Sequence, residues 1–193
     1  MLLPLPAATM PTDSTTALVL QALQFAAHKH RNQRRKDEAQ SPYVNHLITV
    51  ANLLANPGSV TDPITLMGGI LHDTLEDTQT TPEELEAAFG PAVRQVVQEV
   101  TDDKSLPKAD RKRLQIEHAP HLSHHARQIK LADKISNVQD VITSPPKDWP
   151  LERRQEYLAW TENVVAGCRG VNPALEALYD QTLAEGWQTI GHP

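Results

Sequence analysis

The feature that most constrains this fold is an apolar segment that ends abruptly in ionisable residues. The segment starts at Asp62-Pro63, continues through residues 64–71 with one polar side chain, and closes with His72-Asp73-Thr74-Leu75-Glu76-Asp77. Asp followed by Pro is a typical helix start, with Asp as the N-cap and Pro at the first helical position. The pattern predicts a buried helix whose last turn delivers polar groups to a pocket.

The rest of the chain also has a helical pattern. Thr81 and Glu84 are spaced as a capping box, and Gly90-Pro91 is expected to end that helix and begin the next. We find no alternating strand pattern, internal repeat or glycine-rich phosphate loop, so the expected class is all-α. From apolar periodicity and from Pro and Gly breaks we expect further helices over residues 16 to about 33, 44–54, 108–119, 129–141, 151–168 and 173–186.

The length of 193 residues fits one domain, which we place at residues 14–193. Residues 1–13 contain Pro4 and Pro6 and lack a basic segment before their apolar part, so we expect a disordered leader and no secretory signal. Translation from Met10 is equally compatible with this pattern. The lone Cys168 cannot form an internal disulfide, which favours a reducing cytoplasmic location.

Charge and hydropathy limit the partners. The formal net charge of −6 argues against nucleic acid and anionic membranes, and no apolar stretch approaches the roughly 20 residues that span a bilayer. Against this acidic background, five basic residues within 29–36 favour a small anionic ligand. The commoner fate of such a run is a solvated helix end.

The acidic end of the apolar segment carries the candidate chemistry. On a continuous helix His72 lies one turn before Glu76, and Asp73 one turn before Asp77, so the two pairs share a surface. Burying four ionisable groups is costly unless a cation compensates them. An adjacent His-Asp pair offers one nitrogen and one oxygen ligand, which suits Mn, Fe or Zn.

Two ligands do not close a metal site, so we looked for others. His46 lies early in the second expected helix, and Asp133 interrupts an apolar helical stripe, although an isolated acid there is more often solvated or salt-bridged. With His72 and Asp73 they form a set of two His and two Asp that leaves room for water. A metal ion lowers the pKa of bound water, and the pair Glu76-Asp77 is suited to orient that water and accept its proton.

Read in order, these four residues resemble the HD-domain signature. The segments 34–46, 71–78, 89–108 and 130–141 around them are similar to the hydrolase domain of the RelA/SpoT homologue superfamily. The greatest similarity is to its small stand-alone hydrolases, of the metazoan SpoT homologue type. The resemblance runs from about Ala22 to Gly186, which is nearly the whole chain.

This resemblance implies a single-domain HD-type helical bundle. The implied activity is manganese-dependent hydrolysis of the 3′-pyrophosphate of ppGpp or pppGpp, which gives GDP or GTP and pyrophosphate. No synthetase domain follows, so we expect hydrolysis only. The implied roles are one Mn²⁺ held by His46, His72, Asp73 and Asp133, water activation by Glu76 and Asp77, a basic nucleotide strip with Arg35 and Lys36, a ribose contact from Asn137, and phosphate contacts from Lys108 and Tyr157.

Two alternatives stay open. An HD-type site also suits another phosphorylated nucleotide, such as the 2′-phosphate of NADPH, a deoxynucleoside triphosphate or a 5′-nucleotide. A non-catalytic nucleotide-sensing module is the alternative of a different class, and a purely structural bundle would leave the buried acids uncompensated. Oligomeric state and the choice between ppGpp and pppGpp are left open by the sequence.

The ligand assignment predicts that Asp133→Ala abolishes metal binding, because it removes one of four ligands. The measurement is the Mn²⁺ content of the purified protein after equilibrium dialysis. Stoichiometric Mn²⁺ retained by the variant would contradict the assignment.

Overall fold

The structure is a computed structural model that describes residues 14–192, so the expected leader at 1–13 lies outside the described residues. Within them the chain is helical, with no strand and one isolated bridge between Arg34 and Pro42, and no helix is long and apolar enough to cross a membrane. This confirms the all-α class. The elements are α1 (Thr15–Lys29), α2 (Val44–Ala55), α3 (Pro63–Leu71), α4 (Thr74–Asp77), α5 (Pro82–Val100), α6 (Lys108–His118), η1 (Ala119–His121), α7 (His124–Thr143), α8 (Leu151–Cys168) and α9 (Pro173–Ile190).

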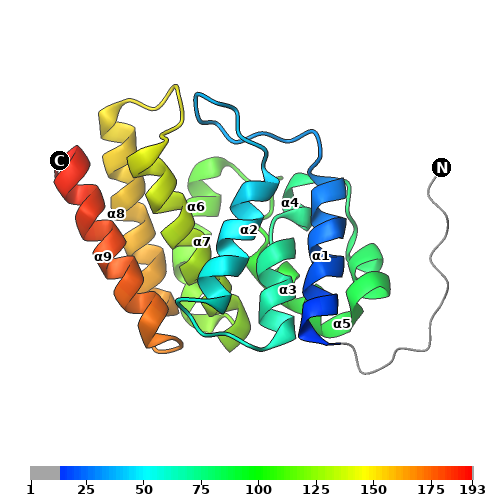
Figure 1. The fold of residues 1–193 in the computed structure, drawn as a ribbon. Coiled ribbons are helices and arrows are strands. Elements are labelled where there is room, and N and C mark those ends of the chain that lie inside the picture. The colour runs from blue at the N-terminus through cyan, green and yellow to red at the C-terminus, as the bar shows by residue number, and fades with distance from the viewer. Residues whose placement is uncertain (1–13, 193) are drawn as a thin grey trace.

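Helix α7 is the centre of the bundle. It packs against α2, α3 and α5 on one side and against α8 and α9 on the other (Figure 1). Its apolar residues Ile129, Ile135 and Val138 are fully buried, as their spacing predicts, and each such burial contributes about 1.5–3 kcal/mol. A second apolar cluster joins α1, α3 and α5. The face of α7 that carries Asp133 is therefore fixed by packing on both sides.

The segment 62–77 is not one continuous helix, so that expectation was wrong. Helix α3 ends at Leu71 and α4 begins at Thr74. The hydroxyl of Thr74 donates to the carbonyl of Leu71 at 2.6 Å, and Nδ1 of His72 lies 2.8 Å from the carbonyl oxygen of Gly69. These side chains take up carbonyls that backbone amides of the next turn would otherwise bind.

The helix boundaries depend on capping groups. The Asp62 carboxylate accepts from the amide of Thr65 at 2.8 Å, which confirms the predicted start of α3. The Thr81 hydroxyl accepts from the amide of Glu84 at 3.2 Å, but the Glu84 carboxylate forms an ion pair with Lys29. Only the Thr81 half of the expected capping box is therefore seen. Helix α1 ends at Lys29, four residues before its expected end, and α7 begins at His124, five residues before its expected start.

Gly90 forms a non-helical bend within α5, at the place where the sequence predicts the end of one helix and the start of the next. Its φ of 83° and ψ of 168° lie in a region that is almost exclusive to glycine, and Pro91 then starts the second half of the helix. The bend lets Leu85 in the first half and Val97 in the second join the same apolar cluster.

We predict that Gly90→Ala lowers the free energy of unfolding by about 1–3 kcal/mol, because a Cβ disfavours this backbone conformation. No atom lies within 4 Å of the added Cβ, so a steric clash does not contribute. Denaturant unfolding measures the change. A variant as stable as the parent protein would show that the bend is not strained for alanine.

Candidate active site

Three helical elements bring the predicted ligands together. His46 lies in the first turn of α2, His72 at the end of α3, and Asp133 in the middle of α7. One ligand atom from each of these buried residues lies within 4.8 Å of the others. Oδ1 of Asp133 is 3.3 Å from Nε2 of His46 and 3.7 Å from Nε2 of His72. Oδ2 of Asp73 lies 3.0 Å from Nε2 of His72 and 3.8 Å from Nε2 of His46.

The hydrogen bonds of the two imidazoles direct Nε2 of each ring toward the carboxylates. Nδ1 of His72 donates to the carbonyl of Gly69, and Nδ1 of His46 lies 3.0 Å from the Ser136 hydroxyl. Nε2 of His72 is buried and has no hydrogen-bond partner among residues 14–192. A buried, unpaired imidazole nitrogen facing two carboxylates fits a divalent metal ion, whose His ligands commonly bond through their other nitrogen to the protein.

A layer of further residues holds the two carboxylates. The Tyr43 hydroxyl donates to Asp73 at 2.6 Å, and Lys134 donates to Oδ2 of Asp133 at 2.9 Å. Sequence reasoning missed both residues and also Ser136. Helical spacing was the available signal, because Tyr43 precedes His46 by three residues and Ser136 follows Asp133 by three.

Burial and charge act in opposite directions at these ligands. Burial raises the pKa of Asp133, but the Lys134 ammonium and the hydrogen bond with His46 hold it well below its usual range. Burial lowers the pKa of His72, yet the carboxylates of Asp73 and Asp133 raise it to about 9. The site therefore holds ionised carboxylates at neutral pH and attracts a cation, which is a proton when no metal is bound.

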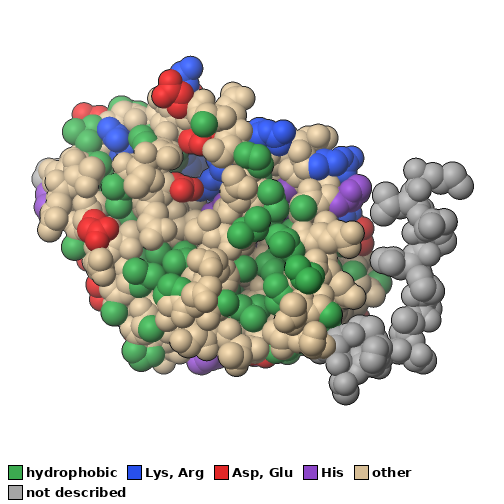
Figure 2. Space-filling model, viewed as in Figure 1, with side chains coloured by type: hydrophobic (Ala, Val, Ile, Leu, Met, Phe, Trp, Pro, Cys, Tyr) green, Lys and Arg blue, Asp and Glu red, His purple; other side chains and the backbone are tan. Residues whose placement is uncertain are grey.

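Two cavities meet at this cluster. The smaller, of about 140 Å³, is lined by His46, His72, Asp73, Asp133 and Glu76. The larger, of about 400 Å³, is lined by residues of the 33–43 segment, α7 and the 144–149 loop, and both loops lie at the same end of the bundle (Figure 1). Figure 2 shows a hollow at this end, with basic, acidic and histidine side chains around it. The two cavities share three lining residues, which are Tyr43, His46 and Asn137.

Glu76 and Asp77 line different cavities, although Lys104 forms an ion pair with both of them. Glu76 lines the smaller cavity, where its carboxylate accepts from the amide of Asp102 at 3.1 Å, and burial raises its pKa. Asp77 lines the larger cavity, accepts from Gln33 at 2.9 Å and pairs with Lys104. The two acids, which are neighbours in the sequence, therefore contact different cavities.

Four of the five expected substrate residues line the larger cavity: Arg35, Lys36, Asn137 and Tyr157. Arg35 donates to Asn137 at 3.0 Å and pairs with Asp140, while Asn137 donates to Asp133 at 2.5 Å. Asn137 thus connects the ligand cluster to the basic residues. Lys108, by contrast, is exposed at the start of α6 and is not among the residues that line either cavity.

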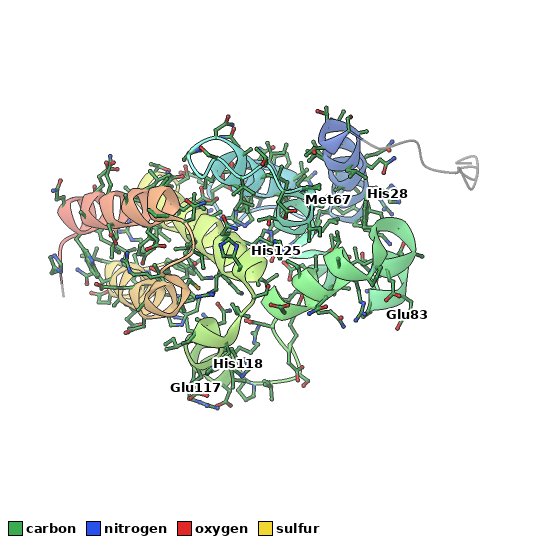
Figure 3. The ribbon with its side chains drawn as sticks, turned by 90° about the horizontal axis from the view of Figure 1, so that it is seen from below. His28, Met67, Glu83, Glu117, His118 and His125 are labelled. Carbon is green, nitrogen blue, oxygen red and sulfur yellow. The ribbon has the colours of Figure 1, made fainter. Side chains whose placement is uncertain are left out.

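Burial raises the pKa of Tyr157 to about 12, so its hydroxyl stays neutral even in alkaline solution. Its ring lies 5.3 Å from those of Trp149 and Trp160. Three other histidines lie apart from the site: His28, His118 and His125 come from α1, α6 and α7 and point to separate places in Figure 3. The high histidine content of the chain therefore does not by itself indicate a metal site. The evidence for a site is that His46 and His72 lie close together.

We predict that uptake of a divalent metal ion at pH 7.5 releases about one proton, because His72 must lose the proton that its raised pKa of about 9 retains. The release should disappear above that pKa, where the imidazole is already neutral. Calorimetric titration with Mn²⁺ in buffers of different ionisation enthalpy measures it. Heats that do not depend on the buffer would contradict this prediction.

Comparison with known proteins places the site in a family. A family model described as "HD domain" matches residues 22–159. The chain is 52% identical over 172 residues to guanosine-3′,5′-bis(diphosphate) 3′-pyrophosphohydrolase MESH1 of Danio rerio, with 89% of this chain and 96% of that protein covered. The protein of the same name from Homo sapiens is 51% identical over 177 residues, covering 92% and 99% of the two chains.

A solved structure shares the fold. It is described as "A metazoan ortholog of SpoT hydrolyzes ppGpp and plays a role in starvation responses", and it matches with a TM-score of 0.85 at 47% identity. The match covers 92% of this chain and 98% of that one. These matches confirm the resemblance found in the sequence. The chain belongs to the HD domain family and, within it, to the MESH1 group of the RelA/SpoT homologue superfamily.

Proposed function

We propose that this protein is a manganese-dependent (p)ppGpp 3′-pyrophosphohydrolase, which yields GDP or GTP and pyrophosphate. The observation that carries the proposal is a buried group of His46, His72 and Asp133, with the half-buried Asp73 3.0 Å from His72. This group adjoins a cavity of about 400 Å³ with cationic residues on its wall. Relatives that are about half identical along nearly their whole length bear the name of this activity. The buried thiol of Cys168 suits the reducing cytosol in which we propose that the enzyme works.

The ligand cluster defines what the chain contributes to metal binding. His46, His72, Asp73 and Asp133 would hold one ion, and Tyr43, Ser136 and Lys134 orient three of these ligands. A bound divalent ion supplies Lewis-acid activation of water and stabilises negative charge on phosphate. Mn²⁺ suits the mixed nitrogen and oxygen ligand set.

Glu76 is the proposed base for the attacking water. It is the acid of the 76–77 pair that lines the ligand cavity, and its raised pKa brings it closer to neutrality, where a general base is most effective. Asp77 lines the larger cavity, where it forms an ion pair with Lys104 and accepts a hydrogen bond from the side-chain amide of Gln33. The proton accepted by Glu76 can then pass to solvent or to the leaving nucleotide oxygen.

The larger cavity is the proposed nucleotide site. Arg35 and Lys36 offer cations to the phosphates, and Asn137 offers its amide to a ribose hydroxyl close to the ligand cluster. Tyr157 closes the wall with a neutral hydroxyl. Lys108 is proposed as an outer phosphate contact, because burial and the neighbouring charges of Arg153 and Lys36 all lower its pKa, and a basic surrounding of this kind favours an anion.

The two alternative functions, hydrolysis of another phosphorylated nucleotide and nucleotide sensing without catalysis, differ in which nucleotides the protein should hydrolyse. A cavity with cations on its wall also accepts NADPH or a deoxynucleoside triphosphate, so it does not by itself select guanine. A nucleotide sensor without activity would not require the buried, unpaired Nε2 of His72 beside two carboxylates. The names of the relatives favour the alarmone.

We predict that ppGpp is hydrolysed faster than NADPH or dGTP in the presence of Mn²⁺, and that Glu76→Gln slows this turnover by about 10²–10⁴-fold. Chromatographic measurement of the nucleotide product gives the rate for each substrate, because the three substrates release different phosphate groups. The matched control is Glu83→Gln, an exposed acid on α5 that should leave the rate unchanged (Figure 3). If ppGpp turned over no faster than the other nucleotides, the alarmone proposal would fail.

The pH profile should have an acid limb near neutrality. Both His ligands must be neutral to bind metal, and Glu76, whose pKa burial raises, must be ionised to accept a proton. Activity should therefore fall below about pH 6. A rate that stays constant down to pH 5 would contradict these roles.

A further inference from the structure

A buried histidine outside the ligand cluster has no role in the chemistry described so far. His30 follows α1 as its C-cap, is 2% exposed, and stacks on the ring of Tyr43 with centroids 5.1 Å apart and planes 17° apart. Its Nε2 is buried and has no hydrogen-bond partner in the described part of the chain. A buried imidazole nitrogen without a hydrogen-bond partner lowers the stability of the folded protein compared with an apolar side chain at the same position. The presence of histidine here therefore suggests a role for its other nitrogen.

The other ring nitrogen starts a chain of hydrogen bonds. Nδ1 of His30 lies 2.6 Å from Oε1 of Gln33, and Nε2 of Gln33 lies 2.9 Å from Oδ2 of Asp77. A carboxylate only accepts, so the amide group of Gln33 must face Asp77 and its oxygen must face His30. The proton of His30 is therefore on Nδ1. Reversing the amide would place two oxygens against each other.

The ring of His30 reaches a second acid by stacking. Tyr43, on which it lies, donates its hydroxyl to Oδ2 of Asp73 at 2.6 Å. The backbone amide of Asp77 also donates to the carbonyl of Asp73 at 2.9 Å, so the two acids are joined through the main chain. The imidazole of His30 thus contacts Gln33, which donates a hydrogen bond to Asp77, and Tyr43, which donates a hydrogen bond to Asp73.

We propose that His30 is a positioning residue for the reaction, which fixes Asp77 through Gln33 and Asp73 through Tyr43 while it touches neither acid. The inference rests on the proposed function, because it assumes that these acids take part in hydrolysis. Loss of the Nδ1 donor frees the Gln33 amide to rotate, and Asp77 then loses the partner that holds it opposite Lys104. Turnover should suffer more than nucleotide affinity, since the larger cavity keeps Arg35 and Lys36.

Three variants separate the hydrogen bond from packing. His30→Phe keeps a ring on Tyr43 and removes the donor, whereas His30→Asn keeps a donor near the place of Nδ1 and removes the ring. Gln33→Met removes the next link at similar side-chain length. We expect His30→Phe and Gln33→Met each to lower kcat for ppGpp by about tenfold with KM changed less than about twofold, and His30→Asn to recover part of kcat.

The double variant decides whether the two residues act in one chain. If His30 acts through Gln33, the double variant His30→Phe/Gln33→Met is no slower than either single variant, because the second change removes a link that is already broken. The inference is overturned if the double variant loses kcat by the product of the two single losses. It is also overturned if His30→Phe has the kcat of the parent protein, or if His30→Phe and His30→Asn lose kcat equally. If His30→Phe does not fold, His30→Leu, which also removes the Nδ1 donor, takes its place in the comparison with Gln33→Met.

A spectroscopic measurement makes the test independent of the substrate. Long-range ¹⁵N–¹H spectra of the imidazoles, with the His30 signals assigned by their loss in His30→Phe, report which nitrogen carries the proton. We expect a neutral ring protonated at Nδ1 at pH 7, and a proton on Nε2 would refute the chain. Parent protein that fails to hydrolyse ppGpp refutes the proposed function, whereas parent activity that His30→Phe retains refutes this inference alone.

Discussion

The structure depends on the compensation of charge inside an apolar bundle. Two carboxylates, the buried Asp133 and the half-buried Asp73, face the buried imidazoles of His46 and His72. Asp133 is paired with the buried ammonium of Lys134. Ionised groups in such a place require partners, because burial without them costs several kcal/mol per ion. The protein supplies the ammonium of Lys134 in direct contact with Asp133, and a divalent ion at the cluster would supply further positive charge.

The bundle holds this cluster by packing elements that are distant in sequence. Helix α7 provides Asp133, Lys134, Ser136 and Asn137 from one continuous stretch, while its apolar residues are buried against the neighbouring helices. The break between α3 and α4 directs His72 and Asp73 to the same place. Because Asn137 contacts both Asp133 and Arg35, hydrogen bonds connect the His and Asp cluster to the wall of the larger cavity. A change in one cavity is therefore expected to reach the other.

Sequence reasoning predicted the helices from local pattern, and the residues that it proposed as metal ligands lie close together in the structure. Apolar spacing predicted α7, and Gly90-Pro91 predicted the bend of α5. Sequence reasoning missed the break in the helix at His72-Asp73. Predicting this break requires knowing that the side chains of His72 and Thr74 form hydrogen bonds with carbonyls of the preceding turn. It also missed contacts between residues far apart, such as Arg35 with Asp140 and Gln33 with Asp77, which only the packed bundle defines. The separation of Glu76 from Asp77 follows from the same packing and has no signal in the sequence.

The central claim is that one cation lies between two imidazoles and two aspartates. Anomalous diffraction from crystals grown with Mn²⁺ tests it most directly, because the signal locates the metal without reference to activity. The account predicts a single strong peak within bonding distance of Nε2 of His46, Nε2 of His72 and the carboxylates of Asp73 and Asp133. Crystals that bind Mn²⁺ elsewhere, or that show these four side chains bonded only to one another, would contradict it.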